Sequence, residues 1–210
     1  MHARVKFCGM TGVDDVVLAG RSGASHFGMI FAPSERRIAW SAAEAIAREL
    51  SADSPIPVAV FVDPSRDEVG RVLELFPQAL LQFSGDERPS WIAPYARRAI
   101  KVIHVGAQDG TGSLRERCNR YEEAAVMFDT GSAGLAGGSG TAFAWEIVEP
   151  IVRERPVWIA GGLRAQNVTA CITAIHPFGV DARSGIETDG RKDFDKMRAF
   201  ITAVRDSDAT

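Results

Sequence analysis

The sequence is short of cysteine and of long apolar runs. Its three cysteines are widely spaced among 210 residues, so they suggest neither a disulfide framework nor a Cys-x-x-Cys metal site. This sparing use of cysteine favours a reducing compartment, and we expect a cytoplasmic protein. The longest apolar run, Ile56 to Val62, has about a third of the length that spans a membrane. Because the N-terminus also has no signal-peptide core, we expect no contact with a membrane.

The sequence also lacks a large excess of either positive or negative charge. Lys and Arg number 24 and Asp and Glu number 27, which gives a formal net charge of −3. Basic residues are at most paired, as in Arg36-Arg37 and Arg97-Arg98. A mildly acidic chain without a basic patch is a poor binder of nucleic acid. We therefore expect a small-molecule partner and no nucleic acid. The four histidines have no common spacing, so we also expect no metal site.

Short β-branched or apolar runs alternate with helical patterns along the whole chain, which predicts an α/β fold. The predicted strands are Val5–Cys8, His26–Phe31, Val58–Val62, Ala79–Phe83, Ile100–Val105, Ala125–Asp129, Val157–Ala160 and Gly179–Ala182. The predicted helices are Asp14–Arg21, Ser41–Leu50, Ser65–Phe76, Glu87–Tyr95, Ser113–Arg120, Trp145–Arg155, Asn167–Ile175 and Asp193–Val204. Ser65, Asn167 and Asp193 are expected N-caps. Pro150 is expected to kink or split the helix that contains it.

Eight strand–helix units in 210 residues suit one small, closed (β/α)₈ TIM barrel, a single domain over residues 1–210. The alternative is an open doubly wound sheet. That fold usually has a Gly-x-Gly-x-x-Gly turn after its first strand, and Cys8-Gly9-Met10-Thr11 is not such a turn. In a TIM barrel the active site lies at the carboxyl ends of the strands. The residues that end each predicted strand are therefore the candidates for function.

The first predicted strand ends at Cys8. Side chains alternate along a strand, so Lys6 and Cys8 share the face opposite Val5 and Phe7. The apolar pair is expected to face the helices, which puts Lys6 and Cys8 inside the barrel. A buried ammonium needs a partner, and we expect Asp181, on the eighth strand, to supply it. A nearby ammonium lowers the pKa of a thiol and improves it as a base. The alternative is that Cys8 is only a small buried hydrophobic residue.

The sixth predicted strand ends at Asp129, after the apolar run Val126-Met127-Phe128. A carboxylate at such a position is paired, caps a loop or is functional. The first and sixth strands lie across the barrel mouth from each other, so Asp129 and Cys8 would face a substrate as proton donor and proton acceptor. The alternative for Asp129 is a cap of the following Thr130-Gly131 turn.

Glycine-rich segments follow the last three strands, namely Gly137-Gly138-Ser139-Gly140-Thr141, Gly161-Gly162 and Ser184-Gly185. Backbone N–H groups in such loops can bind a phosphate, and TIM barrels often bind one in their last two loops. Ordinary turns are the alternative. Arg36 follows the second strand, where it could bind a carboxylate or be a solvated loop residue. His104 lies near the end of the fifth strand and is expected to be structural or exposed.

Together these motifs resemble the phosphoribosylanthranilate isomerase family of tryptophan biosynthesis. The matches, spread over nearly the whole chain, are Lys6-Phe7-Cys8-Gly9-Met10-Thr11, Ser34-Glu35-Arg36-Arg37-Ile38, Val58-Ala59-Val60-Phe61-Val62, Leu81-Gln82-Phe83-Ser84-Gly85, Asp129 with Gly137-Gly138-Ser139-Gly140, Phe143-Ala144-Trp145, Ala160-Gly161-Gly162-Leu163 with Asn167-Val168, Gly179-Val180-Asp181, Ser184-Gly185-Ile186-Glu187 and Gly190-Arg191-Lys192-Asp193. Their order and spacing are specific to the family, although no single match is.

The resemblance implies Cys8 as general base and Asp129 as general acid. It implies Arg36 as the carboxylate-binding residue if one residue is missing before Ser34, whereas an ungapped alignment selects Arg37. Further substrate-binding residues implied are Gln82 and Asp181, and the implied phosphate-binding residues are Gly161, Gly162, Ser184 and Gly185. The chain departs from the family at Ser84, where a His is usual, at Ala144, where an Asp is usual, and at Asp63, where an Asn is common.

The implied reaction is the Amadori rearrangement of N-(5-phosphoribosyl)anthranilate to 1-(2-carboxyphenylamino)-1-deoxyribulose 5-phosphate, with no cofactor. Three alternatives remain open. One is the related sugar-phosphate isomerase of histidine biosynthesis, or a barrel that serves both substrates; that relative has an Asp where Cys8 stands. The second is a phosphate-binding barrel with other chemistry, such as a synthase with metal-ligand carboxylates. The third is a non-catalytic phosphate-binding barrel, suggested by Ser84 and Ala144. We expect a monomer or a homodimer.

Overall fold

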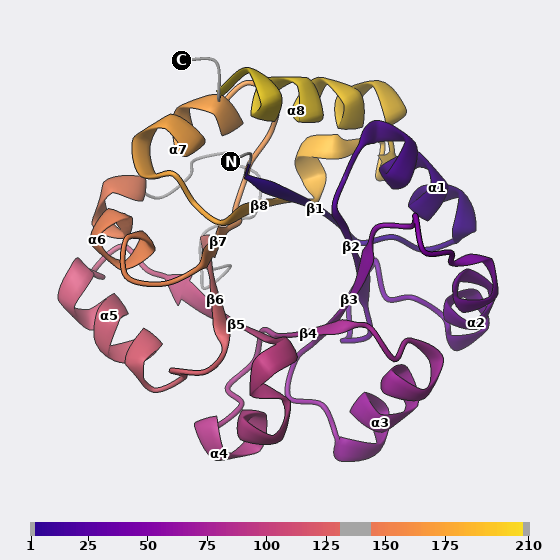
Figure 1. Ribbon diagram of the computed structural model, residues 1–210, viewed down its shortest axis with the longest axis horizontal. Coiled ribbons are helices and arrows are strands. Elements are labelled where there is room, and N and C mark those ends of the chain that lie inside the picture. Colours follow the sequence, from indigo (N-terminus) through magenta and orange to yellow (C-terminus); the bar gives the residue numbers. More distant parts are fainter. Residues whose placement is uncertain (1–2, 131–143, 208–210) are drawn as a thin grey trace.

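Eight parallel strands form a closed barrel in chain order, each paired with its neighbour and the last with the first (Figure 1). The structure is a computed structural model that describes residues 3–130 and 144–207. The strands are β1 Arg4–Cys8, β2 His26–Ile30, β3 Ile56–Phe61, β4 Leu80–Phe83, β5 Ala99–Val105, β6 Ala125–Thr130, β7 Val157–Ile159 and β8 Gly179–Ala182. The predicted (β/α)₈ fold class is confirmed, and the open doubly wound sheet is excluded.

Helices form a ring outside the barrel (Figure 1). The α-helices are α1 Val13–Ser22, α2 Trp40–Glu49, α3 Arg66–Leu75, α4 Pro89–Ile92, α5 Thr111–Asn119, α6 Glu149–Val152, α7 Val168–Ile175 and α8 Phe194–Asp206. Three short 3₁₀ helices are η1 Ala93–Arg98, η2 Trp145–Ile147 and η3 Ser184–Ile186. The short strands β9 Glu187–Thr188 and β10 Arg191–Lys192 pair after β8. Within the described ranges no helix is long and apolar enough to cross a membrane.

The two faces of each strand bury different side chains. Val5 and Phe7 of β1 belong to the large apolar cluster between barrel and helices. Inside the barrel, side chains from alternate positions pack around Met127 and Trp158. Cys8 lies above them in a small interior cluster. The predicted orientation of β1 is therefore confirmed. The interior is a packed core that leaves chemistry to the strand ends.

Two of the three predicted N-caps are confirmed. Ser65 and Glu68 form a reciprocal capping box on α3, and the Asp193 carboxylate accepts hydrogen bonds from the first turn of α8. Asn167 stands at the N-cap position of α7, but its side chain makes no capping bond. It binds back to the preceding loop, accepting from the Arg164 N–H and donating to the Gly162 carbonyl. Asn167 therefore fixes the loop after β7 rather than the helix.

Two predicted helices are shorter than expected. The predicted helix from Trp145 to Arg155 is split into η2 and α6, because Pro150 stands at the start of α6 and has no N–H to continue a preceding helix. The helix predicted from Glu87 begins only at Pro89. Glu87 is instead buried in the loop before it, where its carboxylate lies 2.7 Å from the Lys101 ammonium.

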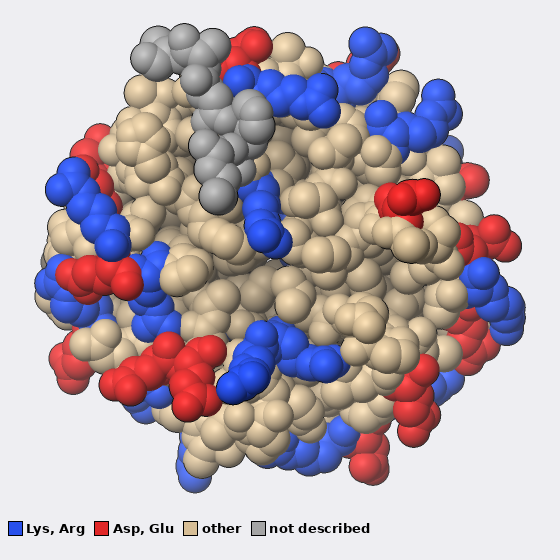
Figure 2. All heavy atoms as spheres, in the orientation of Figure 1, with Lys and Arg blue, Asp and Glu red and all other residues tan. Residues whose placement is uncertain are grey.

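Charged side chains of both signs lie around the rim of the molecule. On the face shown in Figure 2, Lys and Arg alternate with Asp and Glu along the edge, while uncharged atoms fill most of the middle. This mixture agrees with a formal net charge of only −3.

Candidate active site

A buried ion pair joins the first and last strands of the barrel. Lys6 of β1 is paired in register with Asp181 of β8, and its Nζ donates to Oδ1 of Asp181 at 2.7 Å. The Lys6 side chain has no exposed surface and that of Asp181 is 10% exposed. The predicted pair is confirmed. Burial alone lowers the pKa of the Lys6 ammonium, but the charges and hydrogen bonds of Asp181 and Cys8 together outweigh burial, and the net pKa lies above its ordinary value.

Cys8 lies two residues beyond Lys6 along β1, on the same face of the strand. Burial raises the pKa of its thiol above the ordinary value, and the Asp181 carboxylate adds to that effect, while the Lys6 and Lys192 ammonium groups oppose it. The net direction is opposite to the prediction, because burying a thiolate costs more than the Lys6 and Lys192 ammonium groups return, the first of them already paired with Asp181. Cys8 is therefore a thiol at rest and becomes a strong base once ionised.

Space for the Cys8 and Lys6 side chains comes from a missing side chain on the next strand. Gly28 of β2 is the register partner of Cys8. A Cβ atom on Gly28 would stand 2.9 Å from the Cys8 Sγ and 3.0 Å from the Lys6 Nζ. Real Cβ atoms almost never approach so closely, so any side chain here would force Cys8 or Lys6 to shift. The sulfur and the ammonium therefore lie together against bare backbone.

Asp129 lies near the carboxyl end of β6, separated from β1 around the barrel by β7 and β8. Burial raises the pKa of its carboxyl group to about 6, and the Asp181 charge acts in the same direction. His104, Arg183 and Lys6 oppose this shift. Asp129 shares a face of β6 with Met127, which packs in the barrel interior, so Asp129 faces the same interior as the group around Cys8. A carboxyl group with this pKa can be protonated near neutral pH, as a general acid requires.

Polar side chains from β4 and β5 complete this side of the barrel mouth. Gln82 is buried and its Nε2 donates to the Ser84 Oγ at 3.2 Å. His104, which pairs in register with Asp129, binds the Ser84 carbonyl through Nε2 at 3.1 Å. A carbonyl oxygen only accepts, so Nε2 is the donor in this hydrogen bond. Nδ1 is buried and has no hydrogen-bond partner in the part of the chain that the structure describes.

His104 is a residue whose importance the sequence did not reveal. The sequence placed it near a strand end but favoured a structural or exposed role. A buried polar atom without a partner is costly unless a ligand supplies one. The register of β5 against β6 was the missing information, because it is what sets His104 beside Asp129. His104 therefore joins Gln82 as a candidate for substrate contact.

The predicted phosphate loops pack tightly against their surroundings. Gly161 and Gly162 have φ angles of +88° and +69°, which disfavour any other residue. A Cβ on Gly161 would stand 2.1 Å from the Thr130 Oγ1, and one on Gly185 would stand 2.1 Å from the Leu163 carbonyl oxygen. The end of β6 thus approaches the loop after β7, and that loop approaches the segment after β8, with no room for side chains at either glycine. The remaining predicted loop, Gly137 to Thr141, lies outside the described residues, as does Phe143.

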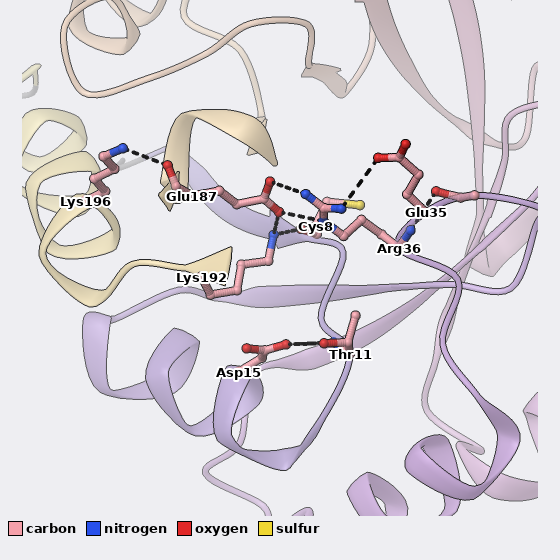
Figure 3. Close-up of polar contacts among 9 residues, drawn as sticks. Cys8, Thr11, Asp15, Glu35, Arg36, Glu187, Lys192 and Lys196 are labelled. Carbon is pink, nitrogen blue, oxygen red and sulfur yellow. Dashed lines mark hydrogen bonds and ion pairs between the residues drawn. The ribbon is translucent and has the colours of Figure 1, made fainter. Parts of the chain in front are cut away.

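Arg36 reaches across from the loop after β2 to the segment after β8 (Figure 3). Its NH2 lies 3.1 Å from Oε2 of Glu187, and its Nε lies 3.4 Å from Oε1. Glu187 also accepts from the Lys192 Nζ at 2.6 Å, and the same Nζ donates to the Cys8 carbonyl at 2.6 Å. Arg37, the other candidate for the carboxylate, is exposed. The hairpin that carries Glu187 and Lys192 was not predicted, although Asp189-Gly190 is a common hairpin turn.

No group of three or more His, Cys, Asp or Glu side chains within residues 3–130 and 144–207 is arranged to hold a metal ion. The three cysteines are free and buried. Cys118 and Cys171 face the helix layer, where burial raises their pKa values to about 11 and about 12. Both belong to the cluster between barrel and helices, whereas Cys8 lies in the barrel interior beside the Lys6 ammonium.

The comparisons with known proteins agree along the whole chain. The family model described as N-(5'phosphoribosyl)anthranilate (PRA) isomerase matches residues 5–203. The N-(5'-phosphoribosyl)anthranilate isomerase of Desulforudis audaxviator is 39% identical over 205 residues, which cover 97% of this chain and 98% of the relative. That of Stenotrophomonas maltophilia strain R551-3 is also 39% identical, over 211 residues.

Solved structures give the same result. The crystal structure of phosphoribosyl anthranilate isomerase from Thermotoga maritima superimposes with a TM-score of 0.86 at 31% identity, covering 97% of this chain and 99% of that one. Another structure of such an isomerase, in complex with reduced 1-(o-carboxyphenylamino)-1-deoxyribulose 5-phosphate, has a TM-score of 0.83. Fold, strand-end residues and full-length similarity together show that this chain belongs to the phosphoribosylanthranilate isomerase family.

Proposed function

We propose that this protein is an N-(5'-phosphoribosyl)anthranilate isomerase of tryptophan biosynthesis. It converts the aminoaldose by an Amadori rearrangement to 1-(2-carboxyphenylamino)-1-deoxyribulose 5-phosphate. The observation that carries the proposal is the pairing of two proton-transfer groups in one barrel mouth. These are the Cys8 thiol beside the Lys6–Asp181 pair and the Asp129 carboxyl with its pKa of about 6. Family membership supplies the substrate that fits this chemistry.

Asp129 is the proposed general acid. The rearrangement begins when the ribose ring oxygen takes a proton and the ring opens to a Schiff base at C1. A carboxyl group donates that proton only when it is protonated itself, and burial gives Asp129 the raised pKa that this requires. An Asp129 carboxyl that kept an ordinary pKa would be ionised in all but about a thousandth of the molecules at neutral pH.

Cys8 is the proposed general base. As a thiolate it removes the proton from C2 of the Schiff base, which gives an enolamine. The enol proton is then lost and C1 gains a proton, so that C2 becomes the ketone of the product. Lys6 lies against the thiolate and favours it electrostatically. Hydrogen atoms only change position within the substrate, so an acid and a base suffice and no electron carrier takes part.

The remaining polar groups are proposed to hold the substrate. Arg36 suits the anthranilate carboxylate, because its guanidinium lies at the loop after β2 and already binds one carboxylate, that of Glu187. Gly161, Gly162, Ser184 and Gly185 are the proposed phosphate-binding residues, since their loops bring bare backbone close together. Gln82 and Asp181 are proposed to contact the sugar portion, together with His104, whose buried Nδ1 has no partner among the described residues and would hydrogen-bond a hydroxyl group. All of these residues come from one chain, so a monomer and a homodimer both fit.

The test is turnover with two substrates. N-(5'-Phosphoribosyl)anthranilate would be made in place from anthranilate and phosphoribosyl pyrophosphate by the preceding transferase, and its fluorescence followed after the purified protein is added. The histidine-pathway aminoaldose would be offered in parallel. Rapid loss of fluorescence with slow or no conversion of the second substrate supports the proposal. Binding of the first substrate without turnover would support the non-catalytic alternative, and preference for the second would support the histidine-pathway alternative.

A further inference from the structure

A hairpin after β8 carries a lysine back to the base at the end of β1. Asp189 and Gly190, with φ angles of +49° and +74°, form its tight turn. The turn pairs Lys192 with Glu187 directly across the two strands, so both side chains lie on one face of the hairpin. Their Nζ and Oε1 atoms are 2.6 Å apart. Because this register is fixed by backbone pairing, Lys192 has a defined position and is not a loosely held surface lysine.

The Lys192 ammonium is buried at the point where β1 ends. Its side chain is 3% exposed, and that of Glu187 is 8% exposed. Nζ donates to the Cys8 carbonyl oxygen at 2.6 Å (Figure 3). The next residue, Gly9, turns the chain with a φ angle of +80°. The hydrogen bond from Lys192 therefore fixes the peptide on which the Cys8 side chain stands, at the residue where the regular strand stops.

Glu187 connects this hydrogen bond to Arg36. One carboxylate accepts from Lys192 and, on both oxygens, from the Arg36 guanidinium. Burial raises the pKa of the Glu187 carboxyl group, but the hydrogen bonds and positive charges of Arg36 and Lys192 together outweigh burial and keep the net pKa below the ordinary value. The carboxylate thus stays ionised between two cations. Figure 3 shows the resulting continuous chain of contacts from Arg36 through Glu187 and Lys192 to Cys8.

We propose that Lys192 is a positioning residue for the isomerase reaction, holding the Cys8 peptide and adding positive charge beside its sulfur. Glu187 ties it to Arg36, so the base and the proposed carboxylate-binding group are fixed relative to each other. The proposal rests on the role proposed for Cys8. The charged groups that act on the Cys8 thiol are Lys6 on the same strand, Asp181 on β8 and Lys192 on β10. Lys192 is the one of these that also binds the Cys8 backbone.

The test removes the Lys192 charge and keeps the length of the side chain. Alkylation of Cys8 by iodoacetamide would be followed against pH by mass spectrometry of the Cys8 peptide, and kcat and KM would be measured against pH in parallel. In Lys192→Met we expect Cys8 alkylation near neutral pH to be about three- to tenfold slower, with its pH profile moved to higher pH. We expect kcat to fall about tenfold or more, with a smaller change in KM.

Two further variants separate positioning from general damage. Lys192→Arg keeps the charge and is expected to restore most of the wild-type pH profile. Lys196→Met is the matched control, because Lys196 is exposed and donates to the Glu187 backbone carbonyl, not to its carboxylate; it should leave both profiles unchanged. Wild-type pH profiles in Lys192→Met would overturn the proposal. If the wild type turns over no substrate, the proposed function fails, yet the alkylation profile still decides whether Lys192 acts on Cys8.

Discussion

Lys6 and Asp181 are register partners at the point where the barrel closes, with Nζ and Oδ1 2.7 Å apart and the ammonium fully buried. Replacing Asp181 by Asn leaves that charge without its counter-ion. We predict that Asp181→Asn loses about 3–5 kcal/mol of unfolding free energy. Denaturant titration at pH 7 measures this loss. The double variant Lys6→Met/Asp181→Asn should recover part of it, and a single variant as stable as wild type would contradict the account.

The pH dependence of the reaction follows from Asp129 and Cys8. At rest Asp129 has a pKa of about 6 and the Cys8 pKa is raised, so the form with a protonated acid and an ionised base is a minority. Below pH 6 Asp129 is fully protonated and the thiolate fraction rises about tenfold per pH unit. Above pH 6 the loss of protonated Asp129 cancels that gain, until Cys8 itself ionises.

We therefore predict that kcat/KM rises with pH up to about 6, is level through neutral pH and falls again at high pH. Steady-state kinetics from pH 5 to pH 10 measure this profile. A level region that starts at pH 4, where an ordinary Asp titrates, would contradict the raised pKa of Asp129.

Gly28 gives a test of the packing around the base. A Cβ there would meet the ends of two flexible side chains, Cys8 at 2.9 Å and Lys6 at 3.0 Å. We predict that Gly28→Ala still folds but lowers kcat by about tenfold to a hundredfold, because the sulfur is displaced. Gly70→Ala is the control, since nothing lies within 4 Å of a Cβ at that helical position. It should gain about 0.5–1 kcal/mol in stability with kcat unchanged; normal kcat in Gly28→Ala would refute the placement of Cys8.

Arg36 and Arg37 are adjacent but lie in different surroundings. The Arg36 side chain is 24% exposed and binds Glu187, whereas Arg37 is exposed. We predict that Arg36→Met raises KM about tenfold or more, as expected for the loss of a carboxylate contact, and that Arg37→Met changes KM less than about twofold. KM values from fluorescence decay at several substrate concentrations separate the two. The reverse order would assign the carboxylate to Arg37.

Much of the barrel could be predicted from the sequence, because strand patterns alternate regularly with helix patterns along the chain. All eight strands, the inward direction of Lys6 and Cys8 and the pair with Asp181 follow from side-chain alternation and barrel closure. The boundaries of helices were harder to predict. Glu87 looks like a good helix start, yet tertiary pairing with Lys101 holds it in a loop. Local propensity contains no information on such a distant partner.

Several residues of the site could be predicted from the sequence, but the pKa of Cys8 could not. The sequence identifies an ammonium near Cys8, but the net pKa depends on how deeply the thiol is buried, which only the fold determines. His104 became a candidate only when its register beside Asp129 was known. Lys192 was part of a recognised motif without a role, because its contact with Cys8 joins residues at opposite ends of the chain.

The central claim is that Cys8 and Asp129 are the base and the acid of one reaction. The most direct test compares wild type, Cys8→Ala and Asp129→Asn for turnover of N-(5'-phosphoribosyl)anthranilate and for binding of the reduced product analogue. We predict that each variant loses about a hundredfold or more in kcat, while its Kd for the analogue stays within about threefold of wild type. Turnover within tenfold of wild type in either variant would contradict the role of that residue.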